Sequence, residues 1–232
     1  MSRALRLLAV TTVVVALASS CLVWRNQWRH TVAVRVADDV AYIDDGDDKH
    51  RLDVFAPAGA SSGAPLPVVI FVHGGWWRAG DRSYYEPVVG LYGNVGVAFA
   101  RHGVRVANCN YRLHPEVKIL GMLDDVAAAT DFIRERFPSA PIILMGHSAG
   151  AHLSSAAVLL DSGPHVDVDA LVLVSGVYDI KRAVDFDSED NREKYLFPLF
   201  GRSGEEQGTA STLTAVVPRP VRLDTSATGL CS

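Results

Sequence analysis

The sequence predicts an α/β protein with a doubly wound, mostly parallel sheet. Short apolar runs alternate along the chain with longer segments whose apolar residues have helical spacing, which is the pattern of strands connected by helices. The run 68–72 (Val-Val-Ile-Phe-Val) is apolar throughout, as expected of a strand buried on both faces of a parallel sheet. With 232 residues, of which 49% are hydrophobic and 21% charged, the chain suits one globular domain with short extra segments.

The first expected element is a hairpin with an aspartate-rich turn. A strand near 40–43 and an alternating strand over 51–55 flank the turn, which contains Gly46. The carboxylates of 44–48 are of a type that calcium binds, but the ligand spacing and the distal glutamate of an EF-hand are missing. We therefore expect a solvated turn, followed by a loop over 56–67 where prolines, glycines and serines gather.

Three strand-helix units and one further strand follow the hairpin. Strands that alternate with helices predict parallel connections, and the active sites of such sheets gather at the carboxyl ends of the strands. Gly103 and Pro138 mark the ends of two of the helices. The expected strands are 68–72, 104–108, 142–145 and 170–175, and the expected helices are 84–102, 118–137 and 149–160.

The periodic pattern weakens after residue 179, so we expect the main domain to span 38–200. Within it, 194–200 has enough apolar residues for a short helix or lid, whereas 201–232 is rich in Gly, Ser, Thr and Pro and is expected to be mostly disordered. The strand 170–175 has the apolar composition of an interior strand, yet no further strand follows it. Because it would be a sheet edge with unpaired backbone groups, we expect self-association or poor solubility.

The N-terminal segment 1–28 has the features of a membrane-directed sequence. An uncharged, mostly apolar stretch over 7–24 follows two arginines and reaches the lower end of membrane-spanning length. Two interpretations stay open: the small residues of 16–20 suit cleavage of a signal peptide, whereas Trp24 and Trp28 suit the interfacial belt of an uncleaved signal-anchor. The first predicts a secreted protein, and the second, which we favour, a single-pass membrane protein on the secretory or export route.

The net charge and the cysteine content argue against a nucleic-acid-binding protein and against a disulfide-rich protein. The formal net charge of -4, with no basic cluster outside the N-terminal flanks, argues against a nucleic-acid partner. Three cysteines suggest no disulfide framework, and Cys109 lies in an apolar strand pattern where a buried thiol is expected.

Residues 146–150 spell Gly-His-Ser-Ala-Gly, a G-x-S-x-G pattern directly between an expected strand and an expected helix. In that context the pattern predicts a nucleophile elbow, a strained turn that exposes the oxygen of Ser148. A serine hydroxyl attacks well only when a base removes its proton, so Ser148 is the candidate nucleophile and needs a partner.

Residues 73–77 spell His-Gly-Gly-Trp-Trp at the end of the strand 68–72. The backbone N–H groups of Gly75 and Trp76, together with that of Ala149, are expected to bind the oxyanion of a tetrahedral intermediate. Because Trp76 and Trp77 follow a strand end, we expect at least one of them to line a pocket for an apolar or aromatic substrate group.

Together these motifs resemble an alpha/beta-hydrolase fold family of serine esterases that groups BD-FAE (bacterial-type feruloyl esterase-like), kynurenine formamidase-like and prenylcysteine methylesterase-like enzymes. The resemblance implies hydrolysis of a small-molecule carboxylic ester or related acyl bond, with no metal and no cofactor. The apolar N-terminal segment favours the prenylcysteine methylesterase-like group. The resemblance covers about residues 40 to 200 and rests on 52–55, 73–77, Gly80-Asp81, 110–113, Asp124-Asp125 and 146–153.

The acid and base of a catalytic triad are not found in the sequence. In this fold they follow the serine in the order acid, then histidine, and after Ser148 the histidines are His152 and His165. Asp161, which precedes His165, lies 13 residues along the expected helix, about 20 Å from Ser148, whereas a hydrogen bond spans about 3 Å. His147 and His152 suit structural roles. The sequence therefore resembles a C-terminally truncated hydrolase, and the alternative is a pseudo-hydrolase or a non-catalytic, membrane-tethered binding module.

Overall fold

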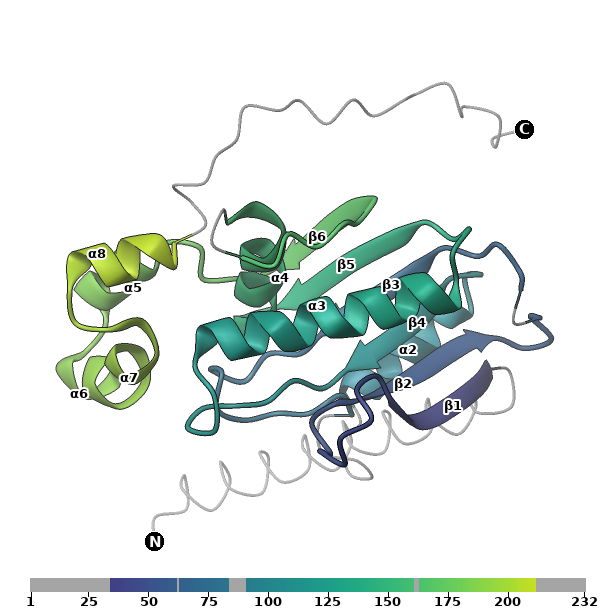
Figure 1. Cartoon of the computed structure of the whole chain (residues 1–232), viewed down its shortest axis with the longest axis horizontal. Coiled ribbons are helices and arrows are strands. Elements are labelled where there is room, and N and C mark those ends of the chain that lie inside the picture. Colours follow the sequence, from purple (N-terminus) through teal and green to yellow (C-terminus); the bar gives the residue numbers. More distant parts are fainter. Residues whose placement is uncertain (1–33, 62, 84–90, 161–162, 212–232) are drawn as a thin grey trace, which may run out of the picture.

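The fold is a six-stranded mixed sheet with helices on both faces (Figure 1). The computed structural model describes residues 34–61, 63–83, 91–160 and 163–211. The strand order is β1-β2-β4-β3-β5-β6, in which β4, β3, β5 and β6 are mutually parallel and β2 is antiparallel to both β1 and β4. The predicted α/β class with a mostly parallel sheet is confirmed.

The expected strand-helix units are present, with boundaries close to those predicted. Residues 84–90 of the expected helix 84–102 lie outside the described residues, and its described part ends in a turn at Gly103, where φ is +81°. The strands are β1 (Val34–Ala41), β2 (Arg51–Pro57), β3 (Val68–Val72), β4 (Arg105–Cys109), β5 (Ile142–His147) and β6 (Ala170–Val174). The longer helices are α2 (Leu91–Ala100), α3 (Ile119–Arg136) and α4 (Ala149–Leu159).

The predicted hairpin is confirmed, although its first strand is longer than expected. β1 begins at Val34, and its pairing with β2 shifts between Ala37 and Val40. Asp39, within this bulge, has φ of +58° and accepts a hydrogen bond from the Arg51 guanidinium. The bulge interrupts the alternation of side chains, which is why the sequence pattern marks only the end of the strand.

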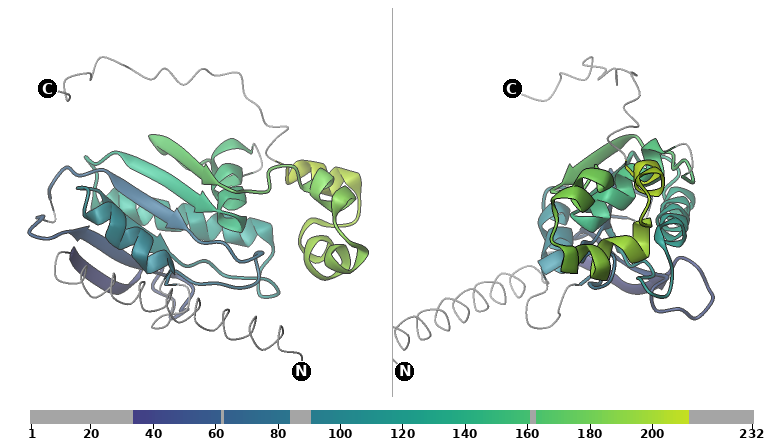
Figure 2. Two further views of the ribbon diagram at one scale, coloured as in Figure 1. Left: turned by 180° about the vertical axis from the view of Figure 1, so that it is seen from behind. Right: turned by 90° about the vertical axis from the view of Figure 1, so that its left-hand side faces the viewer.

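Two apolar layers enclose the sheet. The larger core lies between one face of the sheet and helices α3 and α4, and the smaller lies between the other face and α2 (Figure 2). All residues of β3 and β4 are buried, as predicted for interior parallel strands. Cys109 is also buried, its thiol donates to the carbonyl of Phe71, and burial raises the pKa of the thiol to about 12.

A cluster of short helices lies beyond the carboxyl ends of the parallel strands (Figure 1). The predicted short helix at 194–200 is present as the end of the π-helix η1 and the whole of α7. Its elements are α5 (Ile180–Phe186), α6 (Glu189–Asn191), the π-helix η1 (Arg192–Leu196), α7 (Phe197–Phe200) and α8 (Gly204–Thr209).

Helix α8 corrects part of the prediction for 201–232. The expected disorder is wrong for 204–209, because Ser203 and Glu206 bond each other's side chains and backbone N–H groups, a capping box that starts the helix. Ser211, two residues after α8, holds the chain against the start of α5, because its Oγ accepts a hydrogen bond from Ile180 N at 2.9 Å. The remainder, 212–232, lies outside the described residues.

Two predictions about the ends of the domain have different outcomes. The apolar N-terminal segment 1–28 lies outside the described residues, and among the residues that the structure does describe no helix combines the length and apolarity needed to cross a membrane. Strand β6 lies at the sheet edge, as predicted, and pairs only with β5 within the described residues. Its Val172 and Val174 side chains are 41% and 38% exposed.

Candidate active site

Ser148 lies at a sharp turn between β5 and α4. Its φ of +53° and ψ of -117° belong to a strained region that non-glycine residues rarely adopt. Gly146 and Gly150 permit the turn, because a side chain on Gly146 would clash with the carbonyl of Gly150, and one on Gly150 with that of Val72. The predicted elbow geometry is therefore present, and α4 begins directly against β3.

The loop 73–80 after β3 lies against this elbow. A Cβ atom on Gly74 would be 3.1 Å from the Cβ of Ser148. The loop also closes on itself, since a Cβ on Gly75 would clash with the carbonyl of Ala79, and one on Gly80 would lie 2.6 Å from the carbonyl oxygen of Gly74. Trp76, Trp77 and Arg78 therefore form its tip. We call this segment the oxyanion loop.

The backbone N–H groups of the oxyanion loop are not equivalent. Gly74 N donates to the hydroxyl of Tyr92 at 3.2 Å, whereas Gly75 N and Trp76 N donate to no described residue. Ala149 N is in the first turn of α4, where N–H groups have no acceptor within the helix. The three donors predicted from the sequence are thus available, on two segments that Gly74 and Ser148 bring into contact.

Tyr92 connects the two segments, a role that sequence patterns did not reveal. Its hydroxyl lies 3.0 Å from Nδ1 of His147 as well as accepting from Gly74 N. With one hydrogen bond accepted from Gly74, the hydroxyl can donate its own hydrogen to Nδ1 of His147. Tyr92 belongs to the expected helix 84–102, but nothing in the helical pattern indicates which residue its hydroxyl contacts.

His73 holds the base of the oxyanion loop as a neutral side chain. Its ring is fully buried, and burial lowers the pKa to about 4. At neutral pH one nitrogen therefore carries a proton, and Nδ1 donates to Gly74 O at 2.8 Å. The ring stacks on Tyr111 at 4.4 Å, whose hydroxyl donates to His73 O at 3.0 Å.

The two tryptophans of the oxyanion loop lie in different environments. Trp76 is 50% exposed, whereas Trp77 is 1% exposed and packs edge-on against His152 and Phe200 at 5.4 and 5.0 Å. The Trp77 ring fills the core between the loop, α4 and α7, so of the two tryptophans predicted to line a pocket it is the one with no exposed face. Trp76 remains the tryptophan available to a ligand.

No described histidine forms a hydrogen bond with Ser148. His147 bonds Tyr92, and His152 Nε2 donates to Ala210 O at 3.0 Å while burial lowers its pKa to about 4. His165 lies before β6, and Asp161 is outside the described residues. The structure thus brings the predicted nucleophile and oxyanion donors together, and within its described part it places no triad acid or base beside them.

The aspartate-rich turn forms a hydrogen-bond network around His50. His50 is buried, with Nδ1 2.7 Å from Asp45 and Nε2 3.1 Å from Asp125, which also pairs with Arg112. Across the described ranges no three or more His, Cys, Asp or Glu side chains converge as metal ligands would. Reaction without a metal or cofactor stays a prediction.

The sheet order, the elbow and the oxyanion loop define a protein of the alpha/beta-hydrolase fold. An inhibitor-bound esterase B from Lactobacillus rhamnosis has this fold as well: it matches with a TM-score of 0.65 and 23% identity, covering 88% of this chain and 72% of that one. The family model described as BD-FAE matches residues 52–215. The chain belongs to this family.

Curated relatives match over part of their own length. Kynurenine formamidase of Drosophila melanogaster is 29% identical over 150 residues, which cover 62% of this chain and 47% of that protein. An isoprenylcysteine alpha-carbonyl methylesterase of Arabidopsis thaliana is 28% identical over 152 residues, which cover 59% of this chain and 34% of that protein. The chain therefore spans about half the length of these relatives or less.

Proposed function

We propose that this protein is a serine acyl hydrolase that acts on a small-molecule carboxylic ester. Ser148 is the nucleophile, and the N–H groups of Gly75, Trp76 and Ala149 form the oxyanion hole. The observation that carries the proposal is the close approach of Gly74 to Ser148, a serine in the strained elbow conformation. The next two N–H groups along the chain, those of Gly75 and Trp76, donate to no described residue, which supports their role as oxyanion donors. Membership of the BD-FAE family supports the same chemistry.

The chemical steps follow from this arrangement. Ser148 Oγ attacks the acyl carbon, its proton passes to a base, and the carbonyl oxygen becomes an oxyanion that the three N–H groups stabilise. Collapse of this intermediate breaks the ester bond, releases the alcohol and leaves an acyl-serine, which water then hydrolyses. Each oxyanion donor in such a site contributes about 10²- to 10³-fold to kcat.

We expect slow turnover when the described residues act alone. Loss of the base in a serine triad lowers kcat by about a million-fold and leaves about 10³- to 10⁴-fold over water. No described histidine bonds Ser148, so rapid hydrolysis needs a base from elsewhere. The alternative function is a pseudo-hydrolase or binding module that holds an acyl ligand against Trp76 without cleaving it.

The substrate class and location form a finer part of the proposal. The methylesterase relative acts, by its name, on an isoprenylcysteine ester, and half-exposed Trp76 offers apolar surface for such a group. We propose a prenylcysteine methylesterase-like substrate, with residues 1–28 as a single-pass membrane anchor. Carbonate extraction of membranes followed by N-terminal sequencing tests the anchor: a soluble protein that starts after residue 20 would instead indicate a cleaved signal peptide.

We also propose that the protein self-associates through β6. This strand carries no charge, exposes Val172 and Val174, and leaves one row of backbone groups without partners in the described residues. Such an edge favours pairing with a second strand.

A fluorophosphonate probe tests the proposed chemistry, because it reacts with activated serines. We expect labelling of the folded protein, loss of labelling in Ser148→Ala, and retention in Ser175→Ala. Ser175 is the matched control, since it is exposed and has a similar positive φ of +52° after β6. A folded wild-type sample that takes up no label would contradict the proposal and favour the binding module.

A further inference from the structure

Arg78 lies at the tip of the oxyanion loop, the loop whose Gly74 contacts the nucleophile Ser148. The loop base is fixed on Ser148 by Gly74, and its ends meet again at Gly80. Arg78 is therefore only four residues from the contact with Ser148, within a loop that folds back on itself. A long side chain from this position can reach a ligand whose acyl group lies at Ser148.

The Arg78 guanidinium has no partner among the described residues. It forms neither an ion pair nor a hydrogen bond with them, and its Nε is buried. By contrast, Arg82 on the same segment pairs with Asp39 and Asp53. Taking a charged group partly out of water without a partner is unfavourable, so the position of Arg78 indicates an anionic group that binds there.

Tyr195 orients the guanidinium. The Arg78 Cζ atom lies 5.6 Å from the centroid of the Tyr195 ring, and the same ring contacts that of Trp76 at 5.8 Å. Stacking on an aromatic ring leaves the N–H groups at the rim of a guanidinium free for a planar anion. The half-exposed Trp76 ring, which contacts the same Tyr195 ring, offers apolar surface in this region.

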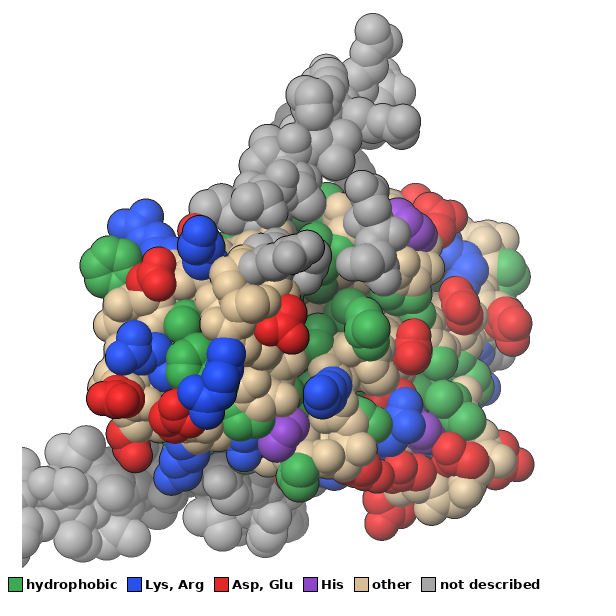
Figure 3. All heavy atoms as spheres, turned by 60° about the vertical axis from the view of Figure 1, so that its left-hand side comes forward, with side chains coloured by type: hydrophobic (Ala, Val, Ile, Leu, Met, Phe, Trp, Pro, Cys, Tyr) green, Lys and Arg blue, Asp and Glu red, His purple; other side chains and the backbone are tan. Residues whose placement is uncertain are grey.

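The groups around Arg78 do not neutralise its charge. Burial and then the charges of Arg78 and Lys118 hold the pKa of His114 below its usual range, so at pH 7 this neighbour is a neutral imidazole. Lys194 Nζ lies 5.1 Å from the Tyr195 ring centroid. On the face in Figure 3, however, basic and acidic side chains are interspersed, and the chain has a net charge of -4. A small anion therefore fits better than a polyanion.

We propose that Arg78 binds a carboxylate on the ligand of this site, while Trp76 contacts the apolar or aromatic part of the same ligand. A carboxylate matches the planar fork of a guanidinium with two parallel hydrogen bonds. Arg78 is then a specificity-determining residue that selects acidic substrates. The inference rests on the proposed function because it places the ligand at Ser148. Binding of the carboxylate to Arg78 does not itself require turnover.

Equilibrium binding tests the inference separately from the chemistry. Phenylpropionate and its neutral analogue phenylpropionamide are titrated by calorimetry into Ser148→Ala, in which no acyl transfer can occur. We expect the carboxylate to bind about tenfold more tightly than the amide, as for one charge-assisted bidentate contact. Adding Arg78→Gln should bring the two affinities within about twofold, and Arg78→Lys should give an intermediate ratio because it keeps the charge but not the fork.

Arg101→Gln is the matched control. Arg101 is exposed after α2, near the amino end of β4, so this variant removes the same charge at the end of the strands opposite to the site and should keep the tenfold ratio. Equal binding of both compounds, no binding of either, or a ratio that Arg101→Gln removes as well would overturn the inference. Fluorophosphonate labelling of Ser148 is measured independently, so failure of the proposed chemistry is distinguished from failure of the Arg78 site.

Discussion

At the scale of single residues, Tyr92 positions the two parts of the candidate active site. Its hydroxyl bonds both Gly74 N and His147 Nδ1, and so connects the oxyanion loop with the residue before the nucleophile. It does not contact the reacting atoms itself. Its effect on chemistry would come through the placement of the donors that follow Gly74.

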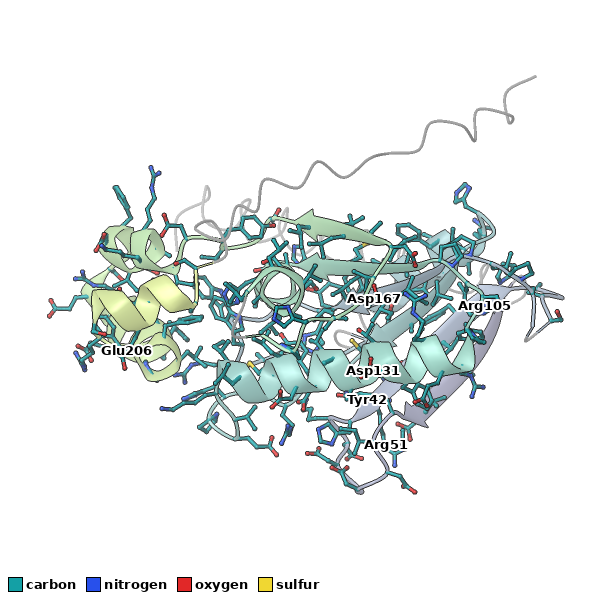
Figure 4. The ribbon with its side chains drawn as sticks, turned by 45° about the horizontal axis from the view of Figure 1, so that its top comes forward. Tyr42, Arg51, Arg105, Asp131, Asp167 and Glu206 are labelled. Atoms are coloured by element: carbon teal, nitrogen blue, oxygen red, sulfur yellow. The ribbon has the colours of Figure 1, made fainter. Side chains whose placement is uncertain are left out.

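We predict that Tyr92→Phe slows fluorophosphonate labelling of Ser148 by about fivefold, because about 1 kcal/mol of hydrogen bonding that fixes the loop is lost. Tyr42→Phe is the matched control. The Tyr42 hydroxyl bonds the backbone carbonyls of Lys49 and Asn110. Figure 4 shows Tyr42 far from Glu206, which belongs to the cluster of short helices. Urea unfolding should register a similar loss of stability in both variants. Equal labelling rates in both would remove the positioning role.

His73 and His152 make stability depend on pH. Both are fully buried, and burial lowers the pKa of each to about 4 from the ordinary 6.5. Between these values the unfolded chain binds protons that the folded chain does not, so the free energy of unfolding falls as pH falls. Stability is fully present above pH 6.5, and each histidine removes about 3 kcal/mol by pH 4.

Urea unfolding between pH 7 and pH 4.5 measures this dependence. His152→Gln, whose amide can still donate to Ala210 O, should lose about half of the slope with pH. His102→Gln, on the exposed turn after α2, should keep the wild-type slope. A slope in His152→Gln as steep as in the wild type would contradict burial of the neutral ring.

At the scale of secondary-structure elements, apolar runs and turn residues were sufficient to predict the sheet. β3 and β4 are buried throughout and every second residue of β5 is buried, and the apolar residues of these strands mark them directly. Helix α8 was missed although Ser203 and Glu206 form a capping box, because the surrounding glycines and threonines have low helix propensity. Contacts between segments that are distant in the sequence, such as those of Tyr92 and Arg78, leave no periodic pattern in the sequence and so could not be predicted from it.

The packing of α4 on β3 depends on glycine at the elbow. Gly150→Ala would drive a Cβ into the carbonyls of Val72 and His73. Since backbone cannot yield as a flexible side chain does, we predict a loss of about 3 kcal/mol or more in the free energy of unfolding. Gly63→Ala, with no atom within 4 Å of the added Cβ, should change stability by less than about 0.5 kcal/mol. Chemical denaturation compares the two, and similar stabilities would refute the close approach.

At the scale of the whole molecule, the helical cluster is attached to the sheet at the site itself. Trp77 of the oxyanion loop contacts Phe200 of α7, and His152 of α4 bonds Ala210 just after α8. Trp76 meets Tyr195 of η1 in the same region. A change in the position of this cluster would therefore alter the surroundings of both Trp76 and Arg78, which makes the cluster part of the candidate site.

The exposed edge at β6 sets the final prediction, which concerns assembly. Pairing with a second copy would satisfy the free backbone groups of β6 and cover Val172, and a lysine on an edge strand opposes such pairing through its charge and hydration. We predict that sedimentation shows wild-type dimers or larger species, whereas Val172→Lys is monomeric with an unchanged circular dichroism spectrum. Leu120→Lys places the same charge on an exposed apolar residue of α3, 62% exposed and away from the sheet edge, and should associate as the wild type does. A monomeric wild type, or equal association of both variants, would show that β6 is not the interface.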